Sequence, residues 1–302
     1  MIKLTGLIPA VYTPFHEDGS LNLTQIQPYA DLLIADGADG VFVCGSTGEC
    51  ASMTVEERKI VLEAWVQAVA GRMRVIAHVG GTCQADCVEL ARHALEQGVD
   101  AVGAIAPYYF KPGRVEELVE FYRPIAAACA PLPFYTYHMP SVTGVNLPMK
   151  EFLEKGSQVM PNLNGIKFTS NNFMEMLECI RLEHGRFNIL NGFDEMLLCG
   201  LTVGAEGGVG STYNYTLETY RAILDAYQAG DIEKAREAQQ QSVDIVHVII
   251  RHGGGVRGGK AIMKHIGLDC GNCRLPFAPY TEEEMKQLAE ELNAIGFTKK
   301  LA

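Results

Sequence analysis

A lysine lies inside a segment that otherwise has the composition of a buried strand. Asn164–Asn172 is NGIKFTSNN, in which isoleucine and phenylalanine flank Lys167. Lysine is rarely fully buried unless it is paired or functional, because an unpaired charge away from water is costly. Desolvation disfavours the charged form, so a buried lysine can offer a free amine that condenses with a ketone to give a Schiff base. The alternative is a structural lysine paired with a carboxylate, and this strand alone does not separate the two.

Polar residues near the ends of other apolar runs could supply the groups that such an amine needs. GSTGE at 45–49 offers backbone N–H groups and the hydroxyls of Ser46 and Thr47, which suit a carboxylate or a phosphate. The same turn is also typical of a loop whose glycines serve only its geometry. YTYHMPSVTG places Tyr137 where its phenol can transfer protons. A carboxylate-binding loop, an inward lysine and a phenol together suit a 2-oxo acid such as pyruvate.

An imine on Lys167 would act as an electron sink. The protonated imine draws electrons from the carbon–carbon bond one atom beyond it, so that this bond can break and leave an enamine. Other predicted strand ends place further polar or aromatic side chains at the same rim: Tyr108, Tyr109, Asp194, Glu195 and Ser211. By themselves the two tyrosines predict packing aromatics with their hydroxyls at the surface.

The segments that carry these residues belong to a repeated strand–helix pattern. The short apolar runs are GLIPAVYT, GVFVCGS, RVIAHVG, AVGAIAP, LPFYTYH, LNGIKFT, FNILNGF and GGVGSTY. Between them lie segments with helical period, one opened by a capping box at Thr54–Glu57. Eight such units predict an α/β fold, the (β/α)8 or TIM barrel, whose active sites lie at the C-terminal strand ends. A doubly wound sheet is the alternative, but no G-x-G-x-x-G follows the first run.

The predicted barrel occupies residues 1–230. Residues 231–302 carry only helical signals, such as DIEKAREAQQQSVDIVHVIIRHG and TEEEMKQLAEELNAIG. We therefore predict a C-terminal helical extension packed on the barrel, without a separate function.

Composition excludes several classes of protein. The 302 residues carry a net charge of −11, so no basic surface for nucleic acid is expected, and no apolar run is long enough to cross a bilayer. The N-terminus has the pattern of a first strand and not of a signal peptide. The nine cysteines are an odd number, which predicts reduced thiols in a cytoplasmic protein. CGNC at 270–273 has redox or zinc spacing but no second ligand pair, and we interpret it as a loop.

The same motifs resemble those of the dihydrodipicolinate synthase/N-acetylneuraminate lyase superfamily of pyruvate-dependent Schiff-base aldolases. GSTGE, PYY, the Tyr-x-x-Pro of YHMP, GIKFT and GAEGGVGSTYN follow the family's order and spacing over nearly the whole chain. GFDE, GSTYN and the late RGGKAIMKHIG followed by RLPFAP resemble the lyase branch. Val142 stands where the synthase branch usually carries an arginine that grips a second carboxylate.

The resemblance implies a reversible cleavage of N-acetylneuraminate to pyruvate and N-acetylmannosamine, with no cofactor and no metal. It implies that Lys167 forms the imine with the C2 ketone of the sugar acid and that Tyr137 transfers protons. Ser46 would tune that phenol, together with Tyr109 from a neighbouring subunit of a homotetramer. Ser46 and Thr47 would hold the carboxylate. The other residues expected beside the imine or around the polyhydroxy tail are Thr169, Gly192, Asp194, Glu195 and Ser211.

Two positions depart from the family pattern, and several alternatives remain. His138 replaces a frequent asparagine and has no assigned role, and Phe193 replaces a common tyrosine, which removes a hydroxyl near the tail. The nearest alternative is a sibling aldolase for another sugar acid, such as 2-keto-3-deoxygluconate, or an enzyme of the dihydrodipicolinate synthase type. A metal-dependent barrel aldolase needs a cluster of ligands that the strand ends do not show. A non-catalytic sugar-acid-binding barrel is the remaining alternative.

Overall fold

The apolar runs form the strands of one parallel sheet in the computed structural model, which describes residues 3–301. The strands are β1 (Gly6–Pro9), β2 (Gly40–Val43), β3 (Arg74–His78), β4 (Ala101–Ile105), β5 (Phe134–His138), β6 (Leu163–Phe168), β7 (Asn188–Asn191) and β8 (Gly207–Gly210). Each pairs in parallel with the next along the chain from β2 to β8, and β8 pairs with β1. A parallel bridge between Ala10 and Phe42 joins β1 to β2 and completes the ring. The predicted barrel is confirmed.

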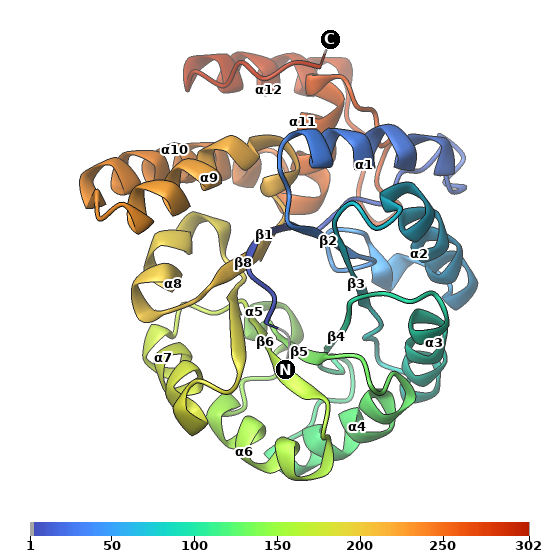
Figure 1. Cartoon of the computed structure of the whole chain (residues 1–302). Coiled ribbons are helices and arrows are strands. Elements are labelled where there is room, and N and C mark those ends of the chain that lie inside the picture. The colour runs from blue at the N-terminus through green and yellow to red at the C-terminus, as the bar shows by residue number, and fades with distance from the viewer. Residues whose placement is uncertain (1–2, 302) are drawn as a thin grey trace.

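Helices surround this ring (Figure 1). They are α1 (Ile26–Ala35), α2 (Val55–Val69), α3 (Gln84–Glu96), α4 (Val115–Ala128), α5 (Pro140–Thr143), α6 (Met149–Val159), α7 (Phe173–Arg181), α8 (Leu197–Val203), α9 (Tyr213–Gln228), α10 (Ile232–Arg251), α11 (Gly254–Ile266) and α12 (Glu282–Ala294). The capping box predicted at Thr54 and Glu57 begins α2, with each residue's side chain bonded to the other's backbone N–H. Helices α10 to α12 follow the last strand–helix unit, and α10 lies beside α9 in Figure 1.

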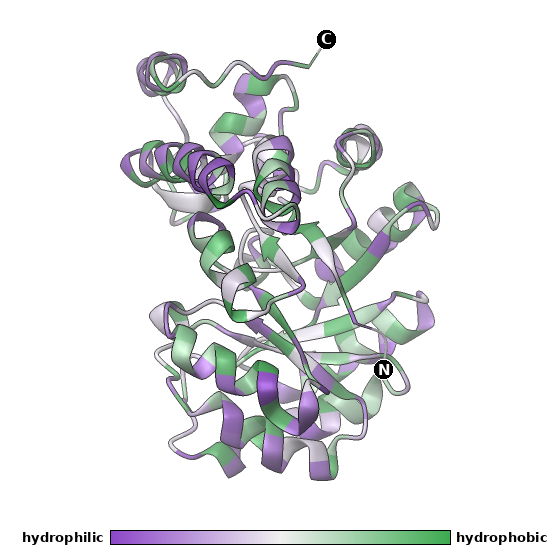
Figure 2. Cartoon of the chain, turned by 60° about the vertical axis from the view of Figure 1, so that its left-hand side comes forward, coloured by the Kyte–Doolittle hydropathy of each residue, from purple (hydrophilic) through white to green (hydrophobic). Residues whose placement is uncertain are grey.

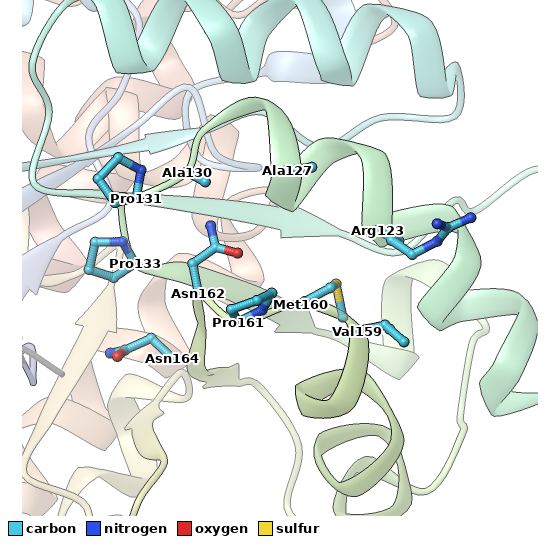
Figure 3. A pocket seen from close by; sticks show the side chains of 10 residues that line it. All are labelled: Arg123, Ala127, Ala130, Pro131, Pro133, Val159, Met160, Pro161, Asn162 and Asn164. Carbon is cyan, nitrogen blue, oxygen red and sulfur yellow. The ribbon is translucent and has the colours of Figure 1, made fainter.

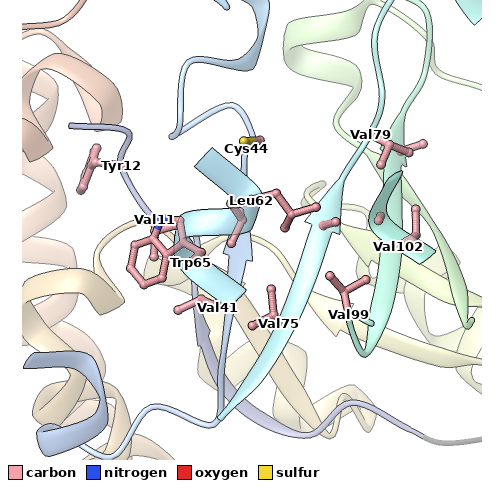
Figure 4. Close-up of a cluster of buried hydrophobic side chains, with 14 of the residues drawn as sticks. Val11, Tyr12, Val41, Cys44, Leu62, Trp65, Val75, Val79, Val99 and Val102 are labelled. Carbon is pink, nitrogen blue, oxygen red and sulfur yellow. The ribbon is translucent and has the colours of Figure 1, made fainter. Parts of the chain in front are cut away.

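Alternating side chains divide the core into two layers. One cluster fills the space between strands and helices. It includes Val41, Val75 and Val102 of the strands, together with Leu62 and Trp65 of α2 (Figure 4). The helices around it alternate apolar and polar residues along their length, whereas the strands are mainly apolar (Figure 2). The second cluster fills the barrel interior. Strand β6 contributes Ile166 and Phe168 to the outer layer, so its intervening residue must face inward.

The cysteines of the described chain are all free, and Cys270 and Cys273 lie in the loop between α11 and α12. This placement agrees with the loop interpretation of CGNC. Across residues 3–301, the model contains no helix with the length and apolar character that a membrane crossing requires.

Candidate active site

Lys167 lies inside the barrel at the C-terminal end of β6. It pairs in register with Tyr137 of β5, and its side chain therefore faces the same way. Its Nζ lies 4.1 Å from the centre of the Tyr137 ring and 4.6 Å from that of Phe42, and the residue is 5% exposed. Within residues 3–301 no carboxylate forms an ion pair with this amine. The structural alternative, a lysine paired with a carboxylate, is therefore wrong, and the amine is left to a ligand.

A cavity of about 300 Å³ opens above this amine at the C-terminal ends of the strands. Nine of the residues predicted for the site line it: Ser46, Thr47, Tyr137, Lys167, Thr169, Gly192, Asp194, Glu195 and Ser211. They come from five different strand ends, which is the arrangement that a barrel enzyme requires.

One wall of the cavity carries two buried oxygen atoms, from Asp194 and Thr169, that lack hydrogen-bond partners among the described residues. The Asp194 Oδ2 atom accepts hydrogen bonds from the N–H and the hydroxyl of Thr212, at 2.8 and 2.6 Å. Within the described chain its Oδ1 atom is buried without a partner, as is the Thr169 hydroxyl. Buried polar atoms normally have partners, so these two atoms indicate a place for a ligand's hydroxyl groups. Burial raises the pKa of the Asp194 carboxyl to about 6, although the hydrogen bonds from Thr212 lower it.

Two glycines allow the side chains of this wall to pack close to the backbone. A Cβ on Gly192 would stand 1.9 Å from the Thr169 hydroxyl oxygen, and a Cβ on Gly210 would stand 1.7 Å from Asp194 Oδ1. Any larger residue at either position would displace the acceptor beside it. The glycines of NGFDE and GGVG are therefore required by side-chain contact at the site.

The opposite wall is the 45–49 loop after β2. Ser46 is half-buried and Thr47 is buried, and both face the cavity. The loop is anchored to the strand-1 end of the barrel, because the Thr13 hydroxyl donates a hydrogen bond of 2.7 Å to the carbonyl of Gly48. Small residues with free hydroxyls on an anchored turn suit a carboxylate.

Tyr137 and Tyr109 are placed differently from one another. The Tyr137 hydroxyl donates to the Met139 sulfur at 3.0 Å, a contact that the sequence did not suggest. None of the hydrogen bonds between described residues joins it to Ser46. Tyr109 is 76% exposed and lies outside the cavity lining of its own chain, with its ring against that of Phe110. The single chain therefore does not bring Tyr109 to the site.

His138 lies on the outer side of β5, away from the cavity. Its ring centre is 5.2 Å from that of Phe168, which belongs to the outer core. Burial lowers the pKa of His138 to about 4. This position fits a packing residue.

The C-terminal helices line the cavity as well, which the sequence had not led us to predict. Val246, Ile249 and Ile250 of α10 and Gly255 and Val256 of α11 form a largely apolar side of the pocket. The apolar run DIVHVII carried the only local signal, and it does not distinguish a helix that packs on the barrel from one that also borders a ligand. The extension thus completes the pocket in addition to packing on the barrel.

A second, larger hollow of about 570 Å³ lies at the other end of the barrel, beside the N-terminal ends of β5 and β6 (Figure 3). Its lining is mostly apolar, and its Arg123 is paired with Glu120. It lacks the amine, hydroxyl and carboxylate groups of the first cavity. Among residues 3–301 no group of three or more His, Cys, Asp or Glu side chains is placed to hold a metal ion.

Comparison with known proteins decides the family. Residues 3–295 match the model of the dihydrodipicolinate synthetase family. The chain belongs to this family.

Within the dihydrodipicolinate synthetase family, several similar proteins are named N-acetylneuraminate lyase. The mouse protein named N-acetylneuraminate lyase is 38% identical over 98% of this chain and 93% of its own length. The solved structure of the lyase from Aliivibrio salmonicida has a TM-score of 0.95 at 40% identity, and covers 99% of each chain. The structure of the Proteus mirabilis lyase has a TM-score of 0.95 at 39% identity, covering 98% of this chain and 100% of that one. These matches agree with the lyase-like motifs of the sequence.

Proposed function

We propose that this chain cleaves N-acetylneuraminate reversibly to pyruvate and N-acetylmannosamine, through a Schiff base on Lys167. One observation carries the proposal. A single cavity brings together a phenol, two kinds of polar wall and an inward amine that has no carboxylate partner among the described residues. The full-length relatives with this name support the choice of substrate.

The first half of the reaction builds the electron sink. The 45–49 loop holds the carboxylate of the sugar acid, which directs its C2 ketone toward the Lys167 amine. The Lys167 amine attacks C2, and the carbinolamine takes up a proton from Tyr137 and loses water to give a protonated imine. Positioning by the loop lowers the entropic barrier to this condensation.

The second half breaks and rebuilds bonds to carbon. The C4 hydroxyl gives up its proton as the C3–C4 bond breaks, and the bonding electrons move into the imine to form an enamine. N-acetylmannosamine leaves as the aldehyde product. A proton then adds to C3, and water hydrolyses the resulting pyruvate imine and frees Lys167. Tyr137 transfers the protons, because its ring lies directly against the amine.

The polar wall selects the polyhydroxy tail. The Asp194 Oδ1 atom and the Thr169 hydroxyl need hydrogen-bonding partners, and a sugar chain presents hydroxyls at every carbon. Glu195 and Ser211 extend this wall toward solvent. A site built from such groups rejects a substrate that lacks the matching hydroxyls.

The proposed assembly rests on the family resemblance and agrees with the exposure of Tyr109. We propose a homotetramer in which this exposed tyrosine reaches the Tyr137 hydroxyl of a neighbouring subunit. An aromatic pair that is 76% and 86% exposed at Tyr109 and Phe110 is unusual on a free surface and is explained by such a contact. The free thiols of the chain fit a reducing compartment, and we place the protein in the cytoplasm.

A reductive trap tests the nucleophile. Pyruvate with borohydride should reduce the imine to a stable secondary amine, and mass mapping should place this adduct on Lys167. The Lys167→Ala variant should form no adduct, whereas Lys150→Ala, which removes an exposed lysine, should be labelled as the wild type is. An adduct elsewhere in Lys167→Ala would refute the assignment.

Substrate comparison tests the reaction. Turnover on N-acetylneuraminate should exceed turnover on 2-keto-3-deoxygluconate, and EDTA should leave it unchanged. A clear preference for the non-acetylated acid would assign the chain to a sibling aldolase, and tight binding without turnover would assign it to a binding protein.

A further inference from the structure

The 45–49 loop is flanked by two residues in a backbone conformation that side chains disfavour. Cys44 and Glu49 both have φ of 57°, and neither is glycine. Such left-handed residues cost about 1 kcal/mol or more and persist only where surrounding contacts hold them. Contacts at both ends of the loop must therefore maintain its shape.

A neutral histidine holds the first end. His78 Nδ1 lies 2.8 Å from the carbonyl oxygen of Cys44, and His78 Nε2 accepts the N–H of Ile105 at 3.2 Å. Because Nε2 accepts, Nδ1 must donate. Burial lowers the pKa of His78 well below its usual range, so the ring stays neutral and keeps this arrangement.

A buried ion pair holds the second end. The Lys260 Nζ atom lies 2.7 Å from Glu49 Oε1, and both side chains are 2% exposed. The other carboxylate oxygen accepts the backbone N–H of Arg274 at 2.8 Å. Lys260 also donates to the carbonyl of Asn272 at 3.2 Å, and it lies over the ring of Phe15 at 4.3 Å from its centre. Two segments of the C-terminal extension thus meet on one loop residue.

Backbone hydrogen bonds couple the position of Glu49 to the positions of Ser46 and Thr47. The N–H of Glu49 donates to the carbonyl of Ser46 at 3.0 Å, and the N–H of Cys50 donates to that of Gly45 at 3.3 Å. The loop is therefore one hydrogen-bonded turn, in which Ser46 and Thr47 share the orientation of Glu49.

We propose that Lys260 is a positioning residue for the carboxylate-binding loop. Its ion pair with Glu49 fixes the orientation of Ser46 and Thr47 toward the substrate carboxylate, and this inference rests on the proposed function of the loop. A buried ion pair contributes little net stability, because desolvation of both charges offsets their attraction. Its effect is to specify one conformation of the turn. The C-terminal extension thereby completes the site from outside the barrel.

Two variants separate positioning from folding. Lys260→Met removes the amine and leaves the Glu49 carboxylate unpaired, whereas the double variant Lys260→Met/Glu49→Gln removes both charges. Lys264→Met is the matched control, because Lys264 is a lysine of the same helix that is 58% exposed and pairs with Asp269. Folding of each is checked by circular dichroism and by thermal unfolding.

Two measurements are then made on the chain of residues 1–302. Hydrogen exchange of the peptide covering 44–53 should be faster in Lys260→Met and in the double variant than in the wild type, with strand peptides unchanged. The pyruvate concentration that half-saturates borohydride trapping should rise about tenfold or more, since small displacements of a positioning group have effects of this size. The maximal trapping rate should change little. The Lys264→Met control should match the wild type in both measurements.

The outcomes distinguish a positioning role of Lys260 from a purely structural one. A folded Lys260→Met with wild-type exchange in the loop and wild-type half-saturation overturns the proposal. If that variant does not fold, the double variant decides on the same two measurements. A wild type that forms no pyruvate adduct refutes the proposed function, and loop exchange then still decides whether Lys260 positions the turn.

Discussion

Replacing Asp194 by asparagine should stabilise the protein at neutral pH. Burial raises the pKa of this carboxyl from 3.8 to about 6. An acid whose pKa is higher in the folded than in the unfolded chain binds more protons when folded. The free energy of unfolding therefore falls as pH rises from about 4 to about 6, and it stays lower above that range. The shift of about two pKa units corresponds to about 3 kcal/mol.

Asparagine removes the charge and keeps the shape. Its amide oxygen can accept the two hydrogen bonds that Thr212 now donates to Oδ2. The free energy of unfolding of Asp194→Asn minus that of the wild type should therefore grow by about 3 kcal/mol between about pH 4 and about pH 8. Groups that titrate equally in both proteins cancel in this difference.

Urea unfolding at several pH values and one fixed protomer concentration measures this difference. Glu195→Gln is the comparison, because it removes the neighbouring charge from a half-buried position, and its difference should grow less with pH than that of Asp194→Asn. A difference for Asp194→Asn that is flat, or that shrinks as pH rises, would refute the reasoning. The Asp194→Asn variant should raise KM for N-acetylneuraminate but leave pyruvate trapping intact, because the proposed site assigns Asp194 to the tail and not to the carboxylate.

Two further substitutions test the strands that carry the site. His138→Phe should remove an acid-sensitive group: burial lowers the pKa of His138 from 6.5 to about 4, so wild-type stability should be lost as pH falls through that window, by up to about 3 kcal/mol relative to the variant. A difference in unfolding free energy between the wild type and His138→Phe that is the same at every pH would contradict this. Gly165→Ala should destabilise the barrel by about 3 kcal/mol or more, because its Cβ would stand 1.8 Å from the carbonyl oxygen of Asn188 and force β6 from β7. Thermal unfolding against Gly113→Ala, whose Cβ would meet only the flexible Glu117 side chain at 3.8 Å, measures this cost, and equal melting temperatures would count against it.

Prediction from the sequence succeeded where the signal is local. Short apolar runs, helical period and a capping box each depend on residues that are near one another in the chain, so the eight units and the start of α2 were predictable. The barrel then places every strand end at one rim, which brought Ser46, Tyr137 and Ser211 together without any knowledge of their contacts.

Prediction failed where a contact joins distant segments. The apolar side formed by Val246, Ile249 and Val256 depends on how α10 and α11 pack across the mouth of the barrel. The helical periodicity of the sequence does not predict that packing. The contact of Tyr137 with Met139 depends on side-chain rotation at the strand end. The pairing of Glu49 with Lys260 joins residues that are far apart in the sequence.

Local sequence is enough to predict that Lys167 lies on a buried strand, because the residues on both sides of it are apolar. The groups that surround this amine depend on how the whole chain folds. Lys167 lies against aromatic rings and forms no ion pair with any carboxylate of residues 3–301, whereas Lys260 is equally buried and pairs with Glu49. The two lysines differ because burial follows from local pattern, but the partner of a buried charge follows from which distant strands and helices close around it.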